Sequence, residues 1–144
     1  MAQEIISEAI SYWRRISAER AMPRRRDLDP VDIPRLLPFV MLVDVLAEPL
    51  DFKFRLIGTQ VSAIIARNCV GQRFSTIPHM AAGNQVWEEY EAVVNTRQPL
   101  AASVDYVGND RYVRAVRHAL MPLSSDDRAV DMIFVAVEIE RKGH

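Results

Sequence analysis

Three strand-like segments near the C-terminal end constrain the fold more than any other feature of the sequence. They cover Leu100 to Tyr106, Tyr112 to Met121 and Val130 to Ile139, and short polar turns at residues 107–110 and 124–127 separate them. Turns of this length and composition join neighbouring antiparallel strands. This part of the chain therefore predicts three consecutive antiparallel strands.

Two further strands are expected earlier in the chain. Phe39 to Leu46 is an almost continuous apolar segment of strand length, which is typical of a central strand buried on both faces. Phe52 to Ile57 alternates between apolar and charged residues, as a half-exposed strand does. The tight connection between the two segments predicts a hairpin.

The remaining apolar patterns have a helical period. Residues 5–19 predict an amphipathic helix, residues 59–65 a short helix that Thr59 caps, and residues 84–96 a longer helix that Asn84 caps. We therefore expect an α+β fold: a five-stranded antiparallel sheet with helices on one face, preceded by an N-terminal amphipathic helix.

Length and charge exclude several classes of protein. The 144 residues suffice for one domain, and the net charge of −1 argues against a nucleic-acid or membrane-surface partner. The six arginines between Arg14 and Arg26 are followed at once by acidic residues, which favours a solvated or internally salt-bridged segment.

The single cysteine, Cys69, excludes an intramolecular disulfide. The longest apolar stretch is too short to span a bilayer, and no signal-peptide pattern is present, so we expect a cytoplasmic protein.

Several local strings resemble a known family. They are Tyr-Trp-Arg-Arg at 12–15, Met-Pro-Arg-Arg-Arg-Asp-Leu-Asp-Pro at 22–30, Leu-Leu-Pro at 36–38 and Phe-Arg-Leu-Ile-Gly-Thr at 54–59, with Gly71 beyond. Together they resemble the PAS-5 family of small PAS-like proteins, which is found largely in alphaproteobacteria. The resemblance implies a PAS-like domain at residues 39–140, preceded at residues 1–38 by the helix and an extended segment rich in proline and arginine.

The resemblance also implies a role. We expect a sensory or protein-interaction module in bacterial signalling, with a small ligand held between sheet and helices and a signalling protein as partner. PAS domains often dimerise through an N-terminal helix, so we expect a homodimer in which Ile6, Ile10 and Trp13 form the interface. The identity of any ligand or cofactor is left open.

Candidate ligand-binding residues are mainly aromatic. We expect a pocket between the sheet and the middle helices, lined by Phe54, Trp87, Tyr90, Tyr106 and Tyr112. An inward-facing Arg114 would bind a carboxylate of the ligand.

Catalytic and metal-binding patterns are missing from the sequence. The histidines and the cysteine are scattered singly, and neither a nucleophile elbow nor a phosphate-binding loop is present. We therefore expect a protein that binds no metal and is not an enzyme. Two alternatives stay open: a small α+β enzyme with a hydrophobic pocket, in which His118, Asp105 or Asp131 is the general acid or base, and a structural adaptor without a ligand.

Overall fold

The structure is a computed structural model that describes residues 4–65 and 68–143. Its helices and strands follow the chain in the order α1 (Glu4–Ser17), β1 (Val40–Leu46), β2 (Asp51–Ile57), α2 (Thr59–Ile64), α3 (Gln85–Thr96), β3 (Leu100–Val104), β4 (Val113–Leu123) and β5 (Met132–Arg141). Single 3-10 turns lie in the connecting segments, at Arg25–Asp27, Pro30–Asp32, Leu37–Phe39 and Phe74–Thr76.

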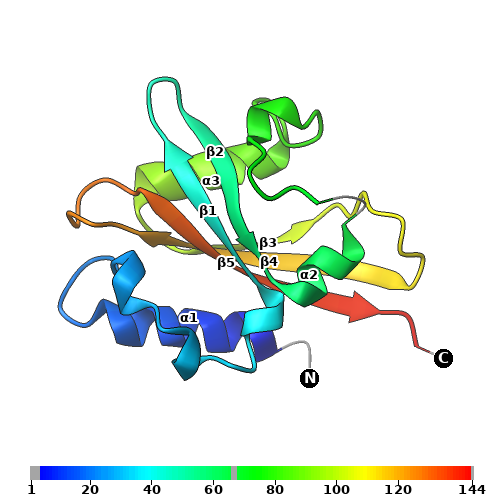
Figure 1. Ribbon diagram of the computed structural model, residues 1–144, viewed down its shortest axis with the longest axis horizontal. Helices are drawn as coiled ribbons and strands as arrows, with labels where there is room; N and C mark the ends of the chain where they lie inside the picture. Colours follow the sequence, from blue (N-terminus) through cyan, green and yellow to red (C-terminus); the bar gives the residue numbers. More distant parts are fainter. Residues whose placement is uncertain (1–3, 66–67, 144) are drawn as a thin grey trace.

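All five strands form one antiparallel sheet in the order β2-β1-β5-β4-β3 (Figure 1). The central strand β5 is buried continuously from Met132 to Ile139, because elements cover both of its faces. A strand in that position favours a continuous apolar run over strict alternation. The predicted α+β fold with a five-stranded antiparallel sheet is confirmed.

Several strand ends differ from the prediction by one or two residues, two of them with a clear physical reason or consequence. The third strand ends at Val104 rather than Tyr106. The fourth strand continues through Pro122 to Leu123. Proline lacks the N–H that a strand with neighbours on both sides needs, but β3 pairs with β4 only as far as Leu120. Beside Pro122, no strand among the described residues lies on that side of β4, so the proline interrupts no ladder there.

Helices cover both faces of the sheet. His118 on β4 pairs with Val137 on β5, and both side chains face α2 and α3. The adjoining pair, Arg117 and Glu138, faces the opposite way because successive side chains on a strand alternate. Glu138 accepts a hydrogen bond of 3.4 Å from the backbone N–H of Ile6, so α1 lies on that second face. The sheet is therefore enclosed between α1 and the pair α2 and α3.

The apolar stripe of α1 packs against its own sheet. Ile6 and Trp13 are each 6% exposed, and the indole N–H of Trp13 donates to the Pro122 carbonyl at 2.8 Å. Ile10 is half-buried against the same core. The side chains that we expected at a dimer interface thus have neighbours within the chain, and the homodimer itself stays a prediction.

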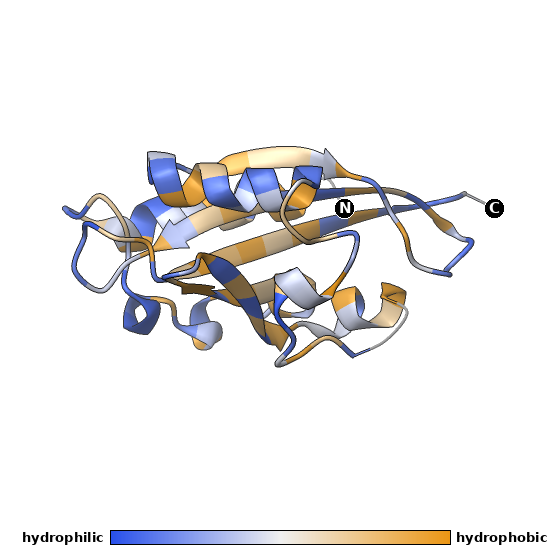
Figure 2. Cartoon of the chain, turned by 90° about the horizontal axis from the view of Figure 1, so that it is seen from above, coloured by the Kyte–Doolittle hydropathy of each residue, from blue (hydrophilic) through white to orange (hydrophobic). Residues whose placement is uncertain are grey.

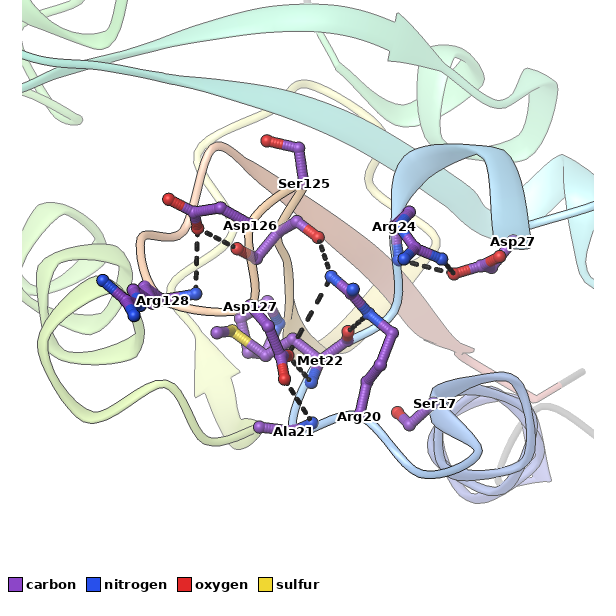
Figure 3. A network of polar contacts seen from close by, with 12 residues as sticks. Ser17, Arg20, Ala21, Met22, Arg24, Asp27, Ser125, Asp126, Asp127 and Arg128 are labelled. Carbon is purple, nitrogen blue, oxygen red and sulfur yellow. Dashed lines mark hydrogen bonds and ion pairs between the residues drawn. The ribbon is translucent and has the colours of Figure 1, made fainter.

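The arginine-rich segment after α1 is tied to the turn between β4 and β5 (Figure 3). Arg20 donates to the carbonyl oxygens of Met22 at 3.0 Å and Ser124 at 2.8 Å. Asp127 in the turn accepts from the backbone N–H of Met22 at 2.9 Å, and the Ser124 N–H donates to the Pro23 carbonyl at 2.8 Å. This part of the arginine-rich segment is thus held by contacts within the protein, as expected.

Buried side chains from the N-terminal region and from the rest of the chain join one core. Ile5, Met22 and Leu36 belong to the same cluster as residues of all the central strands. In Figure 2 the long strands are mostly orange, whereas the helical ribbons alternate between orange and blue, as expected for helices with one face on the sheet. The division that we expected between an N-terminal segment at residues 1–38 and a PAS-like domain at residues 39–140 stays a prediction. No helix within the described residues is long and apolar enough to cross a membrane.

Candidate ligand-binding site

A cavity of about 370 Å³ lies between the inner face of the sheet and the helices α2 and α3. Residues from all five strands line its floor, and residues from the two helices and the segment between them line its roof; the segment between β3 and β4 borders one side. Most of these side chains are aliphatic or aromatic: Met41, Phe54, Val61, Ile64, Ile77, Val86, Val116 and Val137. The volume lies in the range of small-molecule sites in proteins, roughly 300–1,000 Å³.

An aromatic cluster borders the cavity at the β2 edge of the sheet. The rings of Phe52 and Tyr90 lie 5.4 Å apart, and the ring of Phe74 lies 4.8 Å from that of Tyr90, edge to face. Phe74 and Phe52 are both 0% exposed. Contacts of this kind between aromatic rings are favourable, so they help to hold Tyr90 in the cavity wall.

A histidine and a glutamate meet at the polar part of the cavity. Nε2 of His118 lies 2.7 Å from Oε1 of Glu89 on α3, and the second oxygen of Glu89 accepts from the Gln85 side chain at 3.0 Å. His118 is 5% exposed. Burial lowers the pKa of His118 below its ordinary value, because water no longer solvates the imidazolium ion, although Glu89 opposes this shift. The pair therefore presents a neutral imidazole beside a carboxylate.

Tyr106 closes one side of the cavity. Its hydroxyl donates to the backbone carbonyl of Ile64 at the end of α2, at 2.5 Å, and accepts from the Asp110 N–H at 3.0 Å. Gly108 passes so close to this contact that a Cβ atom there would overlap both the Tyr106 hydroxyl and the Ile64 carbonyl. The segment between β3 and β4 is thus held against α2 at the mouth of the cavity.

The structure brings together half of the predicted ligand-binding residues. Phe54, Tyr90 and Tyr106 line the cavity. Trp87 does not, because its side chain packs against Phe52, with ring centroids 5.0 Å apart.

Tyr112 and Arg114 are the other departures from the prediction. Regular alternation along the fourth strand places both on one face with Val116 and His118, but a β-bulge between Val113 and Ala115 breaks the alternation. Val113 is buried instead, Arg114 is exposed, and Tyr112 is 55% exposed. A ligand carboxylate bound by Arg114 inside the cavity is therefore incompatible with this structure.

Analysis of the sequence missed Glu89 and Gln85. The signal was present, because Glu89 lies three residues after Val86 and four before Val93, on the same stripe as Tyr90. A carboxylate on the apolar side of an amphipathic helix needs a polar partner. That partner, His118, lies 29 residues further along the chain, and sequence spacing does not reveal the pair.

Two of the three residues that we considered for catalysis border the cavity, and the third lies elsewhere. His118 lies inside the cavity and Asp105 is exposed at its border. Asp131 lies in the β4–β5 turn, where it accepts hydrogen bonds from the N–H and hydroxyl of Ser125. No group of three or more potential metal ligands occurs among the residues that the structure describes.

Comparisons with known proteins test the family resemblance that the sequence indicated. The fold is similar to that in the crystal structure of a sensory box sensor histidine kinase from Vibrio cholerae, with a TM-score of 0.56 and 8% identity. The match covers 78% of this chain and 90% of that chain, and at such low identity it shows the fold alone. No curated protein matches the sequence. Residues 1–137 match the PAS-5 family model, described as PAS domain, which confirms the resemblance found in the sequence. The chain belongs to this PAS domain family.

Proposed function

We propose that this PAS domain is a sensory module of bacterial signalling that binds a small, mostly apolar molecule in the cavity under α2 and α3. The observation that carries the proposal is the cavity itself, about 370 Å³ in volume and lined mainly by apolar side chains. A filled core would have favoured the alternative of a structural adaptor. A largely apolar hollow with a few polar groups is the usual form of a small-molecule site.

We further propose that α1 carries the output signal. Strands β4 and β5 connect the cavity with α1, because neighbouring residues on each strand point to opposite faces. His118 and Val137 line the cavity, while the adjacent Arg117 and Glu138 form an ion pair of 3.6 Å on the face that α1 covers. A ligand that favours one arrangement of these strands would shift the population of α1 positions. Binding to a partner protein, or to a second copy of the chain, would then respond to the ligand.

Native mass spectrometry of the freshly purified chain, beside its denatured mass, tests ligand binding. We expect additional non-covalent mass in the native spectrum. Val86→Trp places an indole in the cavity and should abolish this mass, whereas Asn95→Trp, at an exposed position of the same helix outside the cavity, should retain it. A bare native mass, together with no thermal stabilisation by any compound in a library of apolar fragments, would contradict the proposal.

A small enzyme is the second candidate function, and the His118–Glu89 pair is the observation that favours it. A neutral imidazole oriented by a carboxylate can act as a general base. Turnover of an ester by the wild type, lost in His118→Asn, would support this candidate. Ligand binding without turnover would leave the sensory function in place.

A further inference from the structure

Two polar groups on the cavity wall have no hydrogen-bond partner among the residues that the structure describes. They are the hydroxyl of Tyr90, a residue that is 1% exposed, and Nδ1 of His118. Within the described part of the chain, every buried side-chain oxygen or nitrogen that has no accessible surface of its own has a hydrogen-bond partner. These two atoms therefore border open space, and the cavity is the space that both side chains line. A buried polar group without a partner costs free energy, which a suitable ligand would recover.

The two groups have complementary hydrogen-bonding roles. Burial and the nearby Glu89 raise the pKa of Tyr90 far above its ordinary value, so the phenol keeps its proton and can donate it. A neutral imidazole carries one N–H, and the contact with the Glu89 carboxylate places that hydrogen on Nε2. Nδ1 of His118 is then an acceptor. The two rings lie 6.3 Å apart, centroid to centroid.

The charges around the cavity disfavour an anionic ligand. Glu89 and Asp105 line it, whereas neither a lysine nor an arginine is among its described lining residues. A carboxylate or phosphate inside would be taken out of water without a cation beside it, which is strongly unfavourable. Arg114 cannot supply the cation, because its side chain is exposed outside the cavity.

We propose that the ligand is an uncharged, mostly apolar alcohol or phenol, whose hydroxyl accepts a hydrogen bond from Tyr90 and donates one to Nδ1 of His118. This inference rests on the proposed ligand-binding function. A hydroxyl can accept one hydrogen bond and donate another through the same oxygen atom, so it can serve both groups at once. A ketone or ether would leave Nδ1 without a donor, and an ammonium group would leave the Tyr90 hydroxyl without an acceptor. Scaling from a cavity of 150 Å³ that holds benzene, the 370 Å³ here would hold about 15 non-hydrogen atoms.

Calorimetric titration of the full chain with four probes of similar length tests the proposal: n-decanol, decanoate, n-decylamine and n-decyl methyl ether. We expect n-decanol to bind most tightly and the ether, which accepts but cannot donate, to bind about fivefold to tenfold more weakly. Decanoate should bind at least about a hundredfold more weakly than n-decanol, because its charge would be buried without a partner. n-Decylamine should also bind more weakly than n-decanol, because its ammonium group cannot accept from Tyr90, and tighter binding of the amine would overturn the proposal.

Tyr90→Phe removes the donor and keeps the ring between Phe52 and Phe74. It should weaken n-decanol binding by about fivefold to tenfold. The matched control is Tyr112→Phe, which removes the hydroxyl of an exposed tyrosine outside the cavity and should change nothing.

Equal affinity for n-decanol and decanoate, or unchanged n-decanol binding in Tyr90→Phe, would overturn the proposal and leave the sensory function standing. The same holds if native mass spectrometry identifies a bound ligand that lacks a hydroxyl. Failure of every probe, together with a bare native mass, would overturn both the proposal and the ligand-binding function.

Discussion

Replacing Trp13 tests how firmly α1 is held on the outer face of the sheet. Trp13 is 6% exposed, and its indole N–H donates to the buried carbonyl of Pro122 at 2.8 Å. Removing a buried tryptophan side chain costs about 3–5 kcal/mol through lost burial and the space left behind. An unpaired buried carbonyl costs about 1–3 kcal/mol, partly included in the first figure. We therefore expect Trp13→Ala to lower the free energy of unfolding by about 4 kcal/mol, a large part of the roughly 5–15 kcal/mol typical of a domain.

Urea unfolding followed by circular dichroism measures this loss. Trp13→Phe separates the two contributions, because it keeps most of the buried ring area but leaves the Pro122 carbonyl without its donor, at a cost of about 1–3 kcal/mol. Arg14→Ala is the control, since that neighbouring side chain on α1 is exposed and should cost less than about 0.5 kcal/mol.

A loss below about 1 kcal/mol for Trp13→Ala, with an unchanged dependence on urea, would refute this reasoning. It would mean that α1 does not pack on its own sheet in solution. A change in oligomeric state without a loss of stability, seen by size-exclusion chromatography with light scattering, would instead place Trp13 in the predicted dimer interface.

Three further predictions concern the cavity and the arginine-rich segment. Because the pKa of His118 is lowered in the folded protein, the unfolded chain takes up a proton at a higher pH than the folded chain does. The free energy of unfolding should therefore be constant with respect to this group well above about pH 6.5 and should decrease as the pH falls below that value. The decrease should stop once His118 is protonated in the folded protein as well. Urea titrations across this range should show the fall, and a His118→Asn variant with the same pH profile as the wild type would exclude His118 as its source. Gly108→Ala should lower the melting temperature by several degrees, because its Cβ would displace Tyr106 from α2; an unchanged melting temperature would show that the contact yields easily. Asp127→Ala should accelerate hydrogen exchange at the two backbone amides that it holds, at Ala21 and Met22, and equal exchange rates would argue that Asp127 does not anchor this segment.

Periodicity in the sequence predicted the existence and type of each α-helix and strand that the structure describes, because apolar side chains recur at 3.6 residues in a helix and at two in a strand. The short polar turns also predicted which consecutive strands pair. The single sheet was expected from the α+β pattern, and the pairing of β1 with β5 that completes it is long-range. The sequence strings between residues 12 and 59 indicated the family. Apart from the long-range pairing, each of these features depends on residues that are close together in the sequence, so it can be predicted from a short stretch of the chain.

The tertiary structure decided which side chains form the site. Glu89 and His118 meet across 29 residues of sequence, and only the packing of α3 over β4 brings them together. A one-residue bulge turned Arg114 out of the face that strict alternation gives it, because each extra residue reverses the orientation of the side chains beyond it. The face of the sheet under α1 was equally undetermined, since an amphipathic helix shows that it covers an apolar surface but not which one. Periodicity thus determined the elements of this protein and the resemblance of its local strings indicated the family, whereas long-range packing determined its cavity and the polar groups that border it.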